Sequence, residues 1–174
     1  MIQFGIRFFL ILVLTFVVHE AAHALAGLAM GFPVEIGLNH VRPVGAVPPD
    51  ATQAMLISAA GPAVTVAIAL IALATMRNSV TGFLIILAAF LCRAMASVVS
   101  LWNANDEMRI SESLGIGAWT LPIAVTLLLG VLVWLAAKGK PFAARHWRVL
   151  YYSGSLGLAA VVGADMVLPR LTIG

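Results

Sequence analysis

Cysteine and charged residues are both scarce in this chain. Only one of its 174 residues is cysteine and only 10% are charged, whereas 62% are hydrophobic. A single cysteine excludes an internal disulfide and any zinc site built from several cysteine thiolates. The share of charged residues lies far below that of ordinary soluble domains, which predicts an integral membrane protein. We expect one domain, residues 1–174.

Basic residues are few, although the net charge is +3. Most are scattered, and one group stands out: Lys138, Lys140, Arg145 and Arg148. A short basic cluster between apolar segments is typical of a membrane flank. The charge therefore indicates contact with the lipid bilayer and does not indicate binding of nucleic acid.

Long hydrophobic runs are abundant, and a run of about 20 apolar residues is enough to cross a bilayer. Five such runs occur: Phe8–Met30, Ala54–Met76, Gly82–Leu101, Ala118–Ala137 and Leu150–Leu168. They predict an all-α, polytopic helix bundle of about five spans, and we expect it in the cell membrane. The first run resembles a cleaved signal peptide, but its apolar character resumes after His23, as in a spanning helix.

The connection Gly31–Asp50 is more than a linker. It contains four prolines and three glycines, and Gly31 is expected to end the first helix. Val34–Ile36 has the composition of a short strand. We predict a re-entrant loop or a short β-hairpin here.

One pentapeptide, His19-Glu20-Ala21-Ala22-His23, lies inside the first apolar run. Residues four apart share one face of a helix, so both imidazoles can bind one metal ion. Glu20 lies beside them and can act as a base toward water without ligating the metal. Ionisable residues inside a membrane span are costly, so this group is a functional hypothesis by default. The pattern is that of zinc hydrolases, with one Zn²⁺ per chain.

A third ligand has to come from elsewhere in the chain, and a carboxylate there, together with ionised Glu20, would balance the charge of Zn²⁺. We predict Asp106 as this third ligand, because it closes the third apolar run. Glu107 is the alternative. Asn103 and Asn105 are expected to hydrogen-bond the backbone of a substrate or to orient the ligand. A different interpretation is that this stretch only caps a short interfacial helix. The other candidates are Glu35, Asp50, Glu112, Asp165 and, as a nitrogen ligand, His40.

Three features of the chain together resemble the site-2 protease family of intramembrane zinc metalloproteases. They are the motif His19–His23 in the first helix, the step Ala60-Gly61-Pro62 in the second, and the Asn/Asp-bearing segment that closes the third. The stretch Gly31–Gly37 is also similar to the family's membrane-associated β-hairpin. The resemblance covers residues Phe8 to Gly115. It implies a zinc site of His19, His23 and Asp106 with Glu20 as catalytic base, and cleavage of transmembrane segments of protein substrates.

A helical substrate hides its carbonyl groups in hydrogen bonds, so such a protease has to unwind it first. We predict that this happens beside Gly31–Asp50, by addition of the substrate to the strand Val34–Ile36. Two other functions stay open: a metal-ion transporter or channel, and an inactive protease homologue that binds membrane helices.

The orientation in the membrane also has two interpretations. The positive-inside rule places the basic segment Lys138–Arg148 in the cytoplasm, which puts the Gly31–Asp50 loop outside. The resemblance implies the opposite, because the family usually keeps this loop and the catalytic site near the cytoplasmic face. We give slightly more weight to the resemblance, because the positive-inside rule depends here on only four charges in one short loop and is a statistical tendency.

Overall fold

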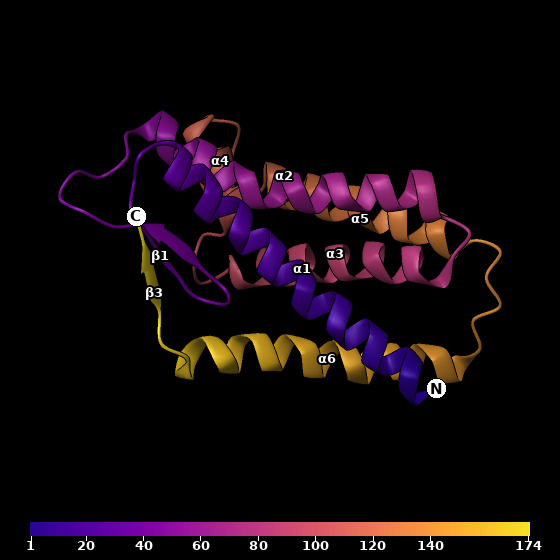
Figure 1. Ribbon diagram of the computed structural model, residues 1–174. Helices are drawn as coiled ribbons and strands as arrows, with labels where there is room; N and C mark the ends of the chain where they lie inside the picture. The colour runs from indigo at the N-terminus through magenta and orange to yellow at the C-terminus, as the bar shows by residue number, and fades with distance from the viewer.

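The structure is a computed structural model that describes residues 1–174, and it is a bundle of helices with one small sheet (Figure 1). The helices are α1 (Ile2–Ala29), α2 (Ala51–Met76), α3 (Val80–Val99), α4 (Asp106–Ser113), α5 (Thr120–Ala137) and α6 (Ala144–Val167). The strands are β1 (Val34–Ile36), β2 (Val41–Pro43) and β3 (Leu171–Ile173). All helices except α4 are long and apolar enough to cross a membrane. The predicted all-α fold of about five spans is confirmed.

Two helices begin more than a turn before the apolar runs that predict them. α1 begins at Ile2 instead of Phe8, and α6 begins at Ala144 instead of Leu150. The extra turns carry the basic residues Arg7, Arg145 and Arg148. Hydropathy marks only the apolar part of a helix, whereas the backbone hydrogen bonds continue into its polar flank.

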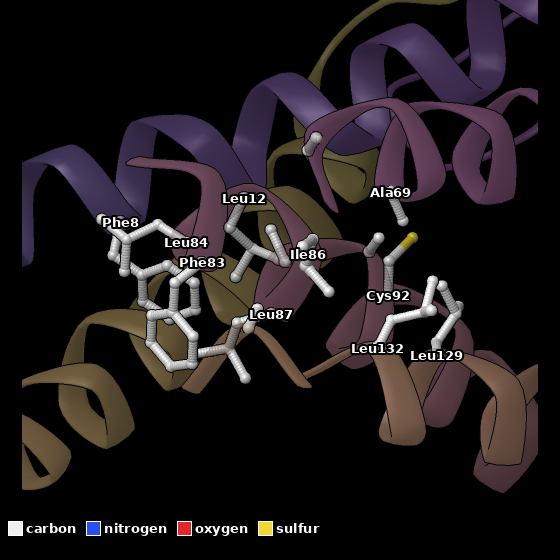
Figure 2. Close-up of a cluster of buried hydrophobic side chains, with 14 of the residues drawn as sticks. Phe8, Leu12, Ala69, Phe83, Leu84, Ile86, Leu87, Cys92, Leu129 and Leu132 are labelled. Carbon is white, nitrogen blue, oxygen red and sulfur yellow. The ribbon is translucent and has the colours of Figure 1, made fainter. Parts of the chain in front are cut away.

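The helices pack around α1 and α3. α1 crosses α2 and α3 obliquely, α5 packs on α3, and α6 packs mainly on α1 (Figure 1). The buried core contains Phe8 and Leu12 of α1, Phe83 of α3 and Leu129 of α5, all fully enclosed (Figure 2). Many large apolar side chains elsewhere on the long helices are exposed, as on the surface of a protein that lies in lipid.

The three strands form an antiparallel sheet in the order β2-β1-β3, beside the end of α1 (Figure 1). The predicted hairpin after the first helix is confirmed as β1 and β2, whereas β3 was not expected. β1 is the central strand, so both of its edges are already paired. The prediction that a substrate adds to Val34–Ile36 is therefore wrong, and the open edge in this hairpin belongs to β2.

Asp165, near the end of α6, holds the tip of this hairpin. Its Oδ1 accepts hydrogen bonds from the backbone N–H of Leu38, at 2.7 Å, and of Asn39, at 3.1 Å. Its Oδ2 lies 3.3 Å from Nδ1 of His40. These contacts join α6 to the loop between β1 and β2.

Arg170 contacts Glu35 of β1, at 3.3 Å. Glu35 also accepts two hydrogen bonds from Arg42 across the β1–β2 pair. These hydrogen bonds, from Arg42 first, hold the pKa of Glu35 below its usual value.

The two ends of the bundle differ in charge. At the end with the α2–α3 and α5–α6 connections, all charged residues are basic. They are Arg7, Arg77, Lys138, Lys140, Arg145 and Arg148. All seven acidic residues lie toward the other end, with the sheet and α4 (Figure 1). A cation is attracted to the second end.

Candidate metal centre

His19 and His23 lie one turn apart on the same face of α1, near its C-terminal end. Their Nε2 atoms are 3.1 Å apart and their ring planes are nearly perpendicular, at 87°. Both residues are buried. The four-residue spacing therefore places two nitrogen donors at one point, as the sequence predicts.

Asp106 brings a carboxylate to the same point from the beginning of α4. Asn105 caps this helix, because its Oδ1 accepts the N–H of Met108 at 2.8 Å. Asp106 is then the first helical residue, and its Oδ2 lies 3.2 Å from Nε2 of His19 and 3.3 Å from Nε2 of His23. The three donor groups are buried and lie within 4.8 Å of one another.

Hydrogen bonds from α2 orient both imidazole rings. Nδ1 of His23 lies 2.6 Å from the carbonyl oxygen of Ile57, so this nitrogen carries the proton. Nδ1 of His19 lies 3.1 Å from Oγ1 of Thr65, whose own proton is donated to the carbonyl oxygen of Gly61. Nδ1 of His19 is therefore also the protonated nitrogen. Both Nε2 atoms keep their lone pairs and point toward Asp106.

Thr65 and the carbonyl group of Ile57 were not expected as partners of the histidines. A signal was present, because Ile57, Gly61 and Thr65 follow one another at four-residue spacing and share a face of α2. Only the packing of α2 against α1 reveals that this face meets the motif.

Gly61 is required by the close approach of α2 to the imidazoles. A Cβ atom at this position would lie 2.5 Å from Cε1 and 2.7 Å from Nε2 of His19. Any larger residue would displace the rings or separate the two helices. The Ala60-Gly61-Pro62 step therefore has a packing function at the site.

The donor set fits a metal ion. Two unprotonated nitrogens and a carboxylate oxygen converge at distances of 3.1 to 3.3 Å, and the assigned tautomers leave no proton between them. Three hydrogen-bond acceptors that face one another in a buried place repel, and a cation between them satisfies all three. Two imidazoles and one carboxylate are a usual ligand set for zinc.

Glu20 and the two asparagines lie at the same cavity. It has a volume of about 480 Å³ and is lined by His19, Glu20, His23, Asn103 and Asn105, among other residues. Asn105 caps α4, in agreement with the capping interpretation, but its side-chain Nδ2 is buried without a hydrogen-bond partner. A free donor therefore remains at the cavity.

The remaining candidate ligands lie outside the metal group, and Glu112 is exposed on α4. Glu35, His40 and Asp165 connect the sheet to α6, and Asp50 caps α2 through the backbone N–H of Gln53. Glu107 points to Arg93 of α3, at 3.2 Å, and is not part of the His–His–Asp group.

Comparison of the chain with known protein families, with curated proteins and with solved structures finds no match. The function is therefore inferred from the geometry of the site.

Proposed function

We propose that this chain is a zinc-dependent intramembrane endopeptidase of the site-2 protease type, located in the cell membrane. The observation that carries the proposal is the convergence of two unprotonated Nε2 atoms and the Asp106 carboxylate beside Glu20, in a bundle whose five long helices are apolar enough to span a membrane. His19, His23 and Asp106 would hold the ion. When bound, zinc supplies a Lewis acid that polarises water and the substrate carbonyl group.

Residues of the chain itself transfer the proton, bind the substrate and exclude bulk water. Glu20 takes the proton of the attacking water and passes it to the leaving amine, as a general base and then a general acid. The free Nδ2 donor of Asn105 and the amide of Asn103 hydrogen-bond the backbone of the extended substrate. The buried position keeps bulk water away from the reacting groups.

The cavity gives a transmembrane segment a route to the site. Its wall includes Met95 and Val99 of α3 and Leu158 and Val162 of α6. These apolar side chains of two spanning helices suit a substrate that arrives from the lipid. We place the entry between α3 and α6.

The open edge of β2 lies at the same cavity, because Val41, Arg42 and Pro43 are among its lining residues. In the β1–β2 register, Arg42 pairs with Glu35, and the flanking bonds are Gly37 N–H to His40 O and Val44 N–H to Pro33 O. This alternation leaves the N–H and C=O of Val41 on the open side. An unwound substrate can pair there, next to the histidines.

A metal-ion transporter would require a polar path through the bundle. Between the site and the basic end, the interior is instead filled by the apolar cluster around Phe8, Leu12 and Phe83 (Figure 2). A closed, apolar interior favours hydrolysis at a site that opens on one end.

The substitution Glu20→Gln tests the proposal. The amide keeps the shape of the side chain but cannot take the proton of water, so we expect bound zinc to remain and cleavage to stop. The measurement is the processing of a tagged single-span substrate in membranes, together with the zinc content. Glu112→Gln, on an exposed residue of α4, is the control and should cleave normally.

Normal cleavage by Glu20→Gln would refute the protease mechanism. Capture of membrane helices by a wild-type protein that holds zinc but never cleaves them would support the inactive homologue instead.

A further inference from the structure

Arg93 is a buried cation inside the helix bundle. It lies on the spanning helix α3, and its side chain is only 4% exposed. A charge within a membrane-spanning segment is costly and therefore indicates a function. Arg93 is neither one of the three metal ligands nor the proposed base.

Both anionic partners of Arg93 stand at the beginning of α4. Its Nη1 lies 3.2 Å from Oε1 and 3.3 Å from Oε2 of Glu107, whose side chain is 2% exposed. The same Nη1 lies 3.4 Å from Oδ2 of Asp106. That oxygen is the one that faces His19 and His23. The guanidinium group therefore joins α3 to the carboxylate at the metal centre.

The buried charges fall into two balanced sets. A divalent cation is balanced by Asp106 and ionised Glu20, and Arg93 is balanced by Glu107. Loss of Glu107 alone would leave an uncompensated cation beside the metal. Loss of Arg93 alone would leave an uncompensated carboxylate in a buried place, which is equally costly.

We propose that Arg93 and Glu107 are positioning residues of the metal centre. Their ion pair fixes the first turn of α4 against α3, so that the Asp106 carboxylate is held opposite the two imidazoles and the site stays neutral. The inference rests on the proposed metal function, but the ion pair itself is present without a metal. It also explains why two adjacent carboxylates follow the third span, one for the metal and one for Arg93.

The test compares Arg93→Met, Glu107→Gln and the double variant, each purified in detergent and titrated with a zinc chelator. We expect each single variant to lose at least about tenfold in zinc affinity, the usual size for a group that orients a ligand. The double variant should lose less than the product of the two single losses, because both unpaired charges are gone. Arg93→Lys keeps the charge and should bind zinc more tightly than Arg93→Met.

Arg109→Met is the matched control. Arg109 also binds Asp106, at 2.5 Å from Oδ1, but its side chain is 54% exposed. An exposed ion pair contributes little, so we expect a change in zinc affinity of less than about fivefold. Equal losses in Arg93→Met and Arg109→Met would overturn the inference, as would single losses that simply multiply in the double variant.

A wild-type protein without zinc would refute the proposed function. The ion pair is then tested by thermal unfolding of the metal-free variants, where the double change should lower the melting temperature by less than the sum of the two single changes. Additive shifts there would overturn the positioning inference as well.

Discussion

His23 of α1 and Ile57 of α2 are joined by a hydrogen bond of 2.6 Å between the ring Nδ1 and the backbone carbonyl oxygen. A backbone acceptor cannot rotate away, so the ring is fixed in one orientation with Nε2 toward Asp106. His19 obtains the same orientation from Thr65. α2 therefore orients the two imidazole ligands that α1 supplies.

Gly61→Ala tests the close approach of α1 and α2. The new methyl group would overlap His19, so we expect zinc affinity to fall at least about tenfold and stability to fall by about 1–3 kcal/mol. Gly163→Ala, in α6, is the control because nothing lies within 4 Å of its added carbon. Zinc titration and thermal unfolding measure both effects. An unchanged Gly61→Ala protein would show that the helices pack less closely than described.

Thr65→Val tests the orientation of His19. Valine has the shape of threonine but cannot accept a hydrogen bond from Nδ1–H of His19. We therefore expect about a 10- to 100-fold loss of zinc affinity. Thr75→Val is a matched control in the same helix, because Thr75 also donates to the carbonyl four residues earlier but is exposed. If both variants bind zinc equally well, Thr65 does not orient the ligand.

Val41→Pro tests substrate pairing at β2. Proline removes the one backbone N–H that Val41 presents on the open edge, while the bonds from Arg42 to β1 can persist. We expect cleavage to slow by about tenfold, the value of one lost hydrogen bond of about 1.4 kcal/mol, with zinc retained. Val41→Thr keeps the amide and should cleave normally. Cleavage at the wild-type rate by Val41→Pro would show that the substrate does not pair with β2.

Asp165→Ala tests the contact between α6 and the hairpin. Loss of the carboxylate leaves the N–H groups of Leu38 and Asn39 without their acceptor, so we expect their hydrogen exchange to accelerate about tenfold or more. Zinc content should not change, because Asp165 does not belong to the metal group. Unaltered exchange would mean that Asp165 does not hold the tip of the hairpin.

Features that depend on neighbouring residues could be predicted from the sequence. Apolar length predicted the five spans, and the spacing of His19 and His23 predicted a shared helical face. Asp106 was singled out because polar residues close the third span, and the structure places it beside both histidines. Val34–Ile36 was expected as a short strand because of its composition, and it forms β1.

Apart from the position of Asp106, features that depend on contacts between distant segments could not be predicted. β3 is a short strand that exists only because it pairs with β1, and this pairing closed the edge that had been assigned to the substrate. The partners of Asp165 and Glu107 likewise depend on how α6 and α3 pack, which no local pattern specifies. Binding roles for Asn103 and Asn105 stay predictions.

Metal analysis of the purified protein tests the central claim most directly. Because the three donors require a cation, we predict about one zinc ion per chain in the wild type and almost none in Asp106→Ala, with Glu112→Ala unchanged as the control. A wild-type chain that holds no metal, or an Asp106→Ala chain that stays fully loaded, would contradict the account.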